Sequence, residues 1–223
     1  MQKFNDWGFT MIGVKDRNKY KGKSRLGKAW YFIWEEDSVL SWVVNIVIAF
    51  VLIKFLVYPG LGFALGGTSH PIVAVVSGSM EHDVAFDDWW QKHENFYDKH
   101  NISKSEFREY KFDGGFNKGD IMVLYKTKPE NIEVGDVLVF RSIRPDPIIH
   151  RVVDTWEENG SYYFKTKGDH NSVSIKSFKL DETRIPEDQV IGEAVFRVPF
   201  VGWVKIGAVE LLARLGLMPG ISM

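Results

Sequence analysis

The chain has 223 residues, a net charge of −1 and no cysteine. This length allows a membrane anchor and one globular domain with a substantial core, and does not suggest several independent domains. The lack of cysteine excludes disulfides, a thiol nucleophile and cysteine-based zinc sites, and the near-neutral charge gives no indication of nucleic-acid binding.

Residues 1–37 form a charged segment that precedes the most hydrophobic part of the chain. The segment holds eight basic residues against five acidic ones and contains the aromatic run AWYFIW near its end. A basic segment that ends in aromatic residues is typical of the cytoplasmic flank of a membrane anchor. We therefore expect residues 1–37 to lie in the cytoplasm.

Residues 38–58 contain the apolar run VLSWVVNIVIAFVLIKFLVY. About twenty residues rising ~1.5 Å each cover roughly 30 Å, the thickness of the hydrocarbon core of a bilayer. The run is therefore predicted to be a transmembrane helix that ends before Pro59. Lys54 is expected to extend toward the membrane interface, and Asn45 to face another helix or another element.

The excess of basic residues before the apolar run predicts its orientation. The N-terminus should remain in the cytoplasm and residues after about 60 should lie outside, which is a single-pass signal-anchor topology at the cell membrane. A buried helix of a soluble protein and a signal peptide cleaved near Ala64 are the alternatives.

The sequence PIVAVVSGSME at residues 71–81 is the first candidate for chemistry. The β-branched run Ile72–Val76 predicts a strand, and Gly78 permits a sharp bend that presents the hydroxyl of Ser79. An exposed hydroxyl at such a bend is a candidate nucleophile. Its place shortly after the apolar run favours chemistry on membrane-borne substrates.

Residues 82–118 are charged and aromatic and read as a partly helical insertion. Ser103 and Glu106 have the spacing of a capping box, and Gly114-Gly115 is a stop signal. The triplet that begins at Asn101 matches an N-glycosylation acceptor.

Three histidines of this insertion are conceivable metal ligands: His82, His93 and His100. They show no recurring ligand spacing, so we expect them to be solvated surface residues and expect no metal.

The sequence predicts a β-rich domain over residues 59–200, within which the insertion lies. The runs rich in β-branched and aromatic residues are Ile121–Thr127, Val137–Ile143, Ile148–Trp156, Tyr162–Gly168 and Val190–Val198. Turn signals built on glycine, proline, asparagine and aspartate separate them, which indicates an antiparallel sheet or a barrel-like sandwich. The fold class is therefore mainly β. Residues 201–223 are predicted to be an amphipathic segment near the membrane.

A serine needs a nearby base before it can act as a nucleophile, and histidine oriented by a carboxylate is the commonest choice. His150 is the best candidate because it lies in a predicted strand, on the same face as Ile148 and Val152. Asp169, at the turn KGDHN, is a candidate carboxylate, with a purely turn-forming role as the alternative.

These residues resemble those of the type I signal peptidases of the archaeal and endoplasmic-reticulum type. The matching motifs are Ser77-Gly78-Ser79-Met80, Gly119-Asp120, Gly135-Asp136, Ile149-His150-Arg151, Lys167-Gly168-Asp169-His170-Asn171, Val190-Ile191-Gly192 and Pro199-Phe200-Val201-Gly202-Trp203. They fall in the order of the family and cover roughly residues 38–206.

The resemblance implies that Ser79 is the nucleophile and His150 the general base, and that the hydroxyl of Ser77 helps to hold the oxyanion. The acidic partner stays open, because the family commonly has a further aspartate just after the Gly-Asp turn and this chain has none there. Asp169 and Asp181 are equally favoured for this role, and Glu182 is an alternative to Asp181.

The implied function is a membrane-bound serine endopeptidase that removes signal peptides from secreted preproteins at the outer face of the membrane. Its partners would be preprotein signal peptides, the lipid bilayer and the protein secretion channel, and no cofactor is expected. The alternative is a non-catalytic, membrane-tethered β-domain that binds secreted proteins or subunits of a secretion complex.

Overall fold

The computed structural model describes residues 24–201 together with residues 207 and 211. The chain divides into two compact units, Met1–Pro59 and Gly60–Met223. Most of the predicted amphipathic segment at 201–223, and the basic segment up to residue 23, lie outside the described residues.

The first unit contains two helices that each begin at a serine. Helix α1 spans Arg25–Trp34 after Ser24, and α2 spans Val39–Leu52 after Ser38. In both cases the serine hydroxyl accepts a hydrogen bond from a main-chain N–H of the first turn, which satisfies a donor that the helix itself leaves free.

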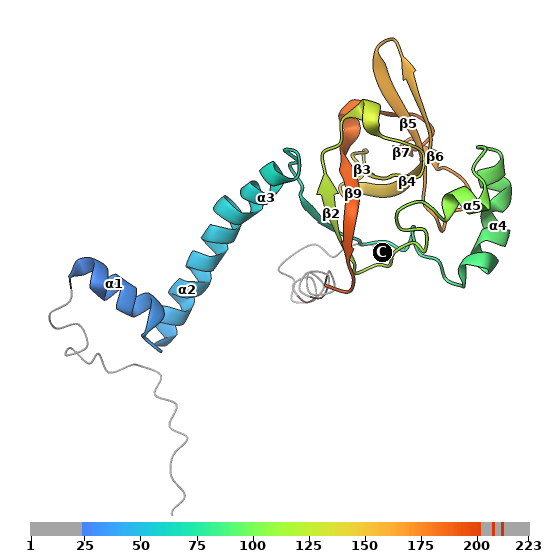
Figure 1. Ribbon diagram of the computed structural model, residues 1–223. Helices are drawn as coiled ribbons and strands as arrows, with labels where there is room; N and C mark the ends of the chain where they lie inside the picture. The colour runs from blue at the N-terminus through green and yellow to red at the C-terminus, as the bar shows by residue number, and fades with distance from the viewer. Residues whose placement is uncertain (1–23, 202–206, 208–210, 212–223) are drawn as a thin grey trace, which may run out of the picture. The chain divides into compact units, whose positions relative to one another are not determined.

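One helix among the described residues is long and apolar enough to cross a membrane. It covers Val39–Ala64, 26 residues that include an 18-residue stretch with a mean hydropathy of 2.5. It consists of α2, a π-helical turn η2 at Ile53–Val57, and α3 at Tyr58–Ala64 (Figure 1). The prediction of an apolar helix is confirmed, whereas the predicted end before Pro59 is wrong.

The helix continues through Pro59, which lies in α3 just after the π-helical turn η2. A proline in a helix removes one N–H and pushes against the preceding turn. The widened π-helical turn comes directly before it, and the N–H of Tyr58 bonds to the carbonyl of Ile53, five residues earlier. Local π-type adjustments are one way in which apolar helices re-satisfy the main-chain groups that a proline frees.

The polar residues of α2 bond to the end of α1. The hydroxyl of Ser41 donates to the carbonyl of Phe32 at 2.5 Å, and the amide of Asn45 donates to the carbonyl of Ile33 at 2.8 Å. The last carbonyls of a helix have no partner within it. The two side chains supply the missing donors, so Asn45 contacts another element, as predicted.

The second unit is built on a curled antiparallel sheet of seven strands (Figure 1). Its members are β1 (Ile72–Ala74), β2 (Ile121–Tyr125), β3 (Val137–Phe140), β4 (Ile148–Glu158), β5 (Ser161–Lys167), β8 (Ile185–Pro186) and β9 (Val190–Val198). The order across the sheet is β1-β2-β9-β3-β4-β5-β8. The mainly β prediction is confirmed.

The remaining strands are short. β6 (Lys176–Ser177) and β7 (Leu180–Asp181) form a separate two-stranded hairpin. Neither of these nor β8 was predicted, because two residues are too few to show an alternation of apolar and polar side chains.

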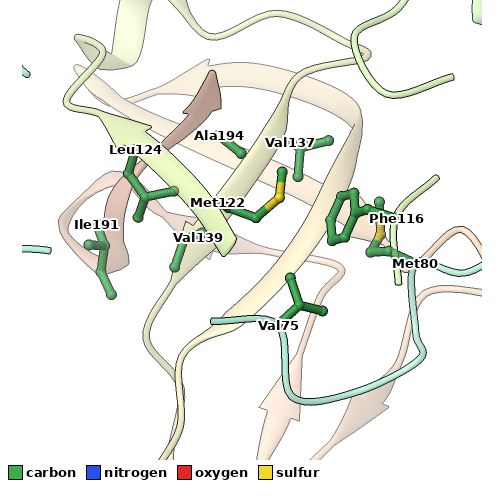
Figure 2. Close-up of a cluster of buried hydrophobic side chains, with 9 residues drawn as sticks. All are labelled: Val75, Met80, Phe116, Met122, Leu124, Val137, Val139, Ile191 and Ala194. Carbon is green, nitrogen blue, oxygen red and sulfur yellow. The ribbon is translucent and has the colours of Figure 1, made fainter. Parts of the chain in front are cut away.

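Strand β3 is buried on both faces, which explains its continuous apolar sequence VLVF. Val137 and Val139 join one core cluster, and Leu138 and Phe140 join another. Figure 2 shows the first cluster, in which Met80 and Phe116 lie side by side close to the residues of β2 and β3. The segment after Ser79 is thereby fixed to the core of the sheet.

The insertion folds into two helices, α4 (Phe86–Asp98) and α5 (Lys104–Phe107), which lie next to each other in Figure 1. The predicted capping box of Ser103 and Glu106 is confirmed. Helix α5 ends at Phe107, well before Gly114, so the predicted stop signal is not where the helix ends.

The insertion has an aromatic core of its own. The buried members are Trp89, Trp90, Tyr97, Ile102, Phe107 and, from β4, Val153. The prediction of solvated histidines is wrong for His82 and His93. The side chain of His82 is 4% exposed, and both rings contact Trp89. Burial lowers the pKa of His93 to about 4.

Candidate active site

Ser79 lies at a tight turn that follows the edge strand β1. The N–H of Glu81 bonds to the carbonyl of Gly78 at 3.1 Å and closes this turn. A Cβ atom at position 78 would lie 2.8 Å from a carboxylate oxygen of Glu81, so a larger residue there would have to displace this side chain. That carboxylate in turn accepts a hydrogen bond from the N–H of Lys118. The turn therefore leaves the hydroxyl of Ser79 half exposed on a fixed main chain.

His150 reaches this hydroxyl from the beginning of β4. The residue pairs with Leu138 of β3 and is 3% exposed. Its Nε2 atom lies 2.9 Å from the Oγ atom of Ser79. A rigid strand thus holds the imidazole within hydrogen-bonding distance of the serine.

The carboxylate that contacts His150 belongs to Glu182. Its Oε1 atom accepts a hydrogen bond from Nδ1 of His150 and another from the hydroxyl of Thr166 at 3.0 Å. Its Oε2 atom accepts from the N–H of Ile175 at 2.7 Å. Glu182 is fully buried, and these bonds compensate the loss of water around its charge.

The contacts assign the tautomer of His150. An ionised carboxylate only accepts hydrogen bonds, so Nδ1 must carry the proton that is donated to Glu182. In the neutral imidazole Nε2 is then an acceptor, and the hydroxyl of Ser79 can donate to it. This is the protonation state that a general base needs.

Neither carboxylate favoured from the sequence is hydrogen-bonded to His150 in the described part of the chain. Asp181 is exposed, and its carboxylate accepts from the N–H and the hydroxyl of Thr183. Asp181 and Glu182 are neighbours, and successive side chains of an extended segment point to opposite sides. Glu182 shares the buried side with Leu180.

Asp169 has a different set of partners. Its Oδ2 atom lies 2.7 Å from Nη2 of Arg151, and both side chains are fully buried. Burial by itself acts to raise the pKa of Asp169, but the charge of Arg151, with a hydrogen bond from His82, holds this pKa below its usual range. Asp169 is therefore an ionised member of a buried ion pair.

A second buried cation lies beside this pair. The Nζ atom of Lys167 bonds to the carbonyls of Gly168 at 3.0 Å and Asp169 at 3.1 Å. Burial lowers the pKa of this amine to about 8. Lys167 thus holds the turn at 168–169 through its main chain.

Ser77, Ser79 and His150 line a cleft of about 640 Å³. Apolar side chains, among them Ala74, Val76 and Ile149, form part of its wall. The hydroxyl of Ser77 lies 3.2 Å from that of Ser79. Residues 24–201 contain no group of three or more histidines and carboxylates that could hold a metal ion.

A serine hydroxyl bonded to a histidine, which is oriented by a buried carboxylate, is the arrangement found in hydrolases with a serine nucleophile. Here it is presented at an open cleft of a β-rich domain.

Comparisons with curated proteins identify the homologues. The "Signal peptidase complex catalytic subunit SEC11C" of Homo sapiens and that of Canis lupus familiaris are each 30% identical over 154 residues, 68% of this chain and 63% of the relative. "Signal peptidase complex catalytic subunit SEC11" of Pyricularia oryzae is 28% identical over 171 residues, 74% of this chain and 80% of the relative. No family model matches the chain.

The chain is thus a homologue of the catalytic subunits of the signal peptidase complex. The match covers 63% of the length of the mammalian relatives.

From the sequence, Glu182 was a candidate for the acidic partner of His150, but it was not one of the two favoured residues. One signal was present: Glu182 stands two residues after Leu180, the apolar residue of β7. Period-two alternation would have placed Glu182 on the buried side and Asp181 on the exposed side.

Proposed function

We propose that the chain is a membrane-bound serine endopeptidase that removes signal peptides from preproteins. The observation that carries the proposal is the 2.9 Å contact between Ser79 Oγ and His150 Nε2 at the open cleft. The homologues support the same reaction class, since these relatives are named as signal peptidase catalytic subunits.

In the proposed reaction, Oγ of Ser79 forms a bond to the scissile carbonyl carbon while its proton passes to Nε2 of His150. The proton then passes to the leaving nitrogen as the C–N bond breaks, and an acyl-serine remains. Water, deprotonated in turn by His150, hydrolyses this ester and regenerates the hydroxyl. Glu182 orients the imidazole and stabilises its charged form.

The N–H of Ser79 and the hydroxyl of Ser77 are the proposed donors to the tetrahedral oxyanion. In the described part of the chain no hydrogen bond engages this N–H. The Ser77 hydroxyl is close enough to Ser79 to reach an oxygen on the carbon under attack. Preorganised donors of this kind stabilise the transition state more than the ground state.

We propose a topology in which residues 1–37 are cytoplasmic, the apolar helix spans the membrane, and the β-rich unit lies at the outer face. The basic flank of the helix supports this orientation. An enzyme confined to the membrane that holds its substrates meets them at a raised effective concentration. The secretion channel would then be a neighbour.

The decisive experiment incubates the full chain in detergent with a preprotein that carries an intact signal peptide. We expect release of mature product, and we expect Ser79→Ala to lower kcat by at least about 10³-fold. The matched control is Ser172→Ala, at an exposed serine outside the proposed machinery. Equal, background-level product from the wild type and Ser79→Ala would refute the protease function.

The orientation has its own test, which the lack of cysteine makes simple. Single cysteines at Lys3 and at Ser172 are exposed to a membrane-impermeant maleimide in intact cells. Labelling of Ser172→Cys alone is expected. Labelling of Lys3→Cys alone would reverse the orientation.

A further inference from the structure

Side chains from separate segments converge on the carboxylate of Asp169. Arg151 of β4 donates to Oδ1 at 3.0 Å and to Oδ2 at 2.7 Å. The hydroxyl of Tyr97, on α4, donates to Oδ1 at 3.2 Å. The Nε2 atom of His82 lies 3.2 Å from Oδ2. Two of these partners, His82 and Tyr97, belong to the insertion.

The insertion holds these two side chains rigidly. The ring of His82 stacks on Trp89 with a centroid distance of 3.7 Å and an interplanar angle of 11°. Tyr97 is fully buried in the aromatic cluster around Phe107. The insertion also binds Arg151, whose guanidinium donates to the main-chain carbonyls of Lys111 and Phe112. The insertion therefore contacts Asp169 directly, and it also holds Arg151, the ion-pair partner of Asp169.

The turn that carries Asp169 contacts the main chain of the serine. The N–H of His170 donates to the carbonyl of Ser79 at 2.9 Å, and the N–H of Asp169 bonds to Sδ of Met80 at 3.3 Å. The insertion also contributes here, because the N–H of Phe116 donates to the carbonyl of Met80 at 3.0 Å. A shift of this turn would move Ser79 relative to His150.

The lining of the cleft shows whether the insertion borders the site around Ser79. Its described lining includes no residue of 82–118. The large aromatic side chains of α4, among them Trp89, Trp90 and Tyr97, pack into the cluster of the insertion itself. Neither a lid over Ser79 nor a wall of the substrate cleft fits this arrangement.

We propose that the insertion is a brace for the nucleophile, in which His82 and Tyr97 are positioning residues. They fix Asp169, and its turn fixes the main chain of Ser79 at the distance that His150 requires. The role of Ser79 in cleavage rests on the proposed function. The mechanical link between the insertion and the serine turn does not depend on it.

The test uses three phenylalanine variants of the full chain in detergent. Tyr97→Phe removes only the hydroxyl, and His82→Phe removes the N–H donor while keeping an aromatic ring against Trp89. Tyr110→Phe is the control, since its hydroxyl donates within the insertion to Glu106 at 2.8 Å and does not touch Asp169. Two quantities are measured: kcat and KM for preprotein cleavage, and hydrogen–deuterium exchange of the His170 amide.

Tyr97→Phe and His82→Phe are each expected to lower kcat about tenfold with KM within about twofold, because a hydrogen bond to a charged group is lost and the serine is displaced. Exchange at His170 should accelerate about tenfold, while exchange in β9 stays as in the wild type. A kcat within about twofold of the wild type in both variants would overturn the brace.

Failure of the proposed function is recognised separately. If the wild type and Ser79→Ala cleave equally little preprotein, the peptidase proposal has failed and amide exchange alone decides the brace. Unchanged exchange at His170 in both variants then overturns it, and accelerated exchange confined to the serine turn supports it.

Discussion

Gly168 packs directly against the main-chain carbonyl of Ser79. A methyl group on Gly168 would lie 2.7 Å from that oxygen and 2.8 Å from Nε2 of His150. Both neighbours belong to the proposed machinery, and neither is the free end of a flexible side chain. The residue at this position must therefore be glycine for a steric reason that concerns the site itself.

Gly168→Ala is predicted to separate Ser79 from His150 and to lower kcat by about 10²-fold or more, since small displacements at a reacting centre are costly. Cleavage kinetics of the purified variant measure the effect. The control is Gly114→Ala, where an added methyl group meets no atom within 4 Å. A Gly168→Ala variant as active as Gly114→Ala would contradict the geometry.

Glu182→Gln is predicted to lower kcat by about 10²- to 10⁴-fold, because the amide does not stabilise an imidazolium and can favour the wrong tautomer of His150. The matched variant is Asp181→Asn at the exposed neighbouring position, for which kcat within about twofold of the wild type is expected. Equal losses for the two variants would show that the hairpin, and not the carboxylate of Glu182, is what matters.

The buried ion pair of Asp169 and Arg151 predicts a large stability effect. Asp169→Asn leaves the guanidinium without its counter-charge, and breaking a buried pair on one side costs about 3 to 5 kcal/mol. A fall in Tm of roughly 10 °C is expected at pH 7. Differential scanning fluorimetry of the full chain in detergent measures it. A Tm within about 2 °C of the wild type would contradict the prediction.

The same pair predicts an acid dependence. The pKa of Asp169 is lowered in the folded protein, so its contribution to stability is present above the pKa of the unfolded chain, about 3.8. This contribution is lost as the pH falls through the lower, folded value. Between pH 5 and pH 2 the Tm of the wild type should fall more steeply than that of Asp169→Asn. Parallel curves would contradict this.

Lys167 predicts a dependence in the alkaline range. Its pKa is about 8 in the folded protein against 10.5 for an ordinary lysine. The unfolded chain therefore binds more protons between these values, and stability rises with pH there, by up to about 1.4 kcal/mol per unit of pKa difference. The ionisable groups around the amine are Arg151, Asp169, Glu182, His93 and Tyr97.

The measurement compares Tm of the wild type and Lys167→Met at pH values from 7.5 to 9.5. This range stays below the titration of Tyr97, whose pKa burial raises well above 10. The difference in Tm, wild type minus variant, should increase with pH. A constant difference would mean that Lys167 does not titrate in this range.

Local features of the fold followed from the sequence, and long-range ones did not. The five long strands and the capping box of Ser103 rest on alternation and on side chains a few residues apart, so short windows were enough to predict them. The order of the sheet depends on pairings such as that of Leu138 with Glu193, which no local pattern encodes.

The site shows the same division. The sequence motifs predicted Ser79 and His150 as the nucleophile and the base, and the structure places them within hydrogen-bonding distance. The choice among Asp169, Asp181 and Glu182 depends on which side of the chain faces inward at residues 180–182 and on which carboxylate is paired with Arg151. Both are properties of packing between distant segments, and a turn-forming aspartate looks the same in sequence as one in a buried ion pair.

The order of the strands also has a consequence for how the chain is made. Strand β9, the last strand of the sheet in sequence, joins β2 to β3. Strands β1 and β2 lead to Ser79, and strands β3 and β4 carry His150. These two parts of the sheet are therefore not joined by hydrogen bonds until Val190–Val198 has left the ribosome and inserted between them. Nucleophile and base are therefore brought together by the sheet only after β9 has been made, so a growing or prematurely ended chain that lacks β9 carries both residues without the site.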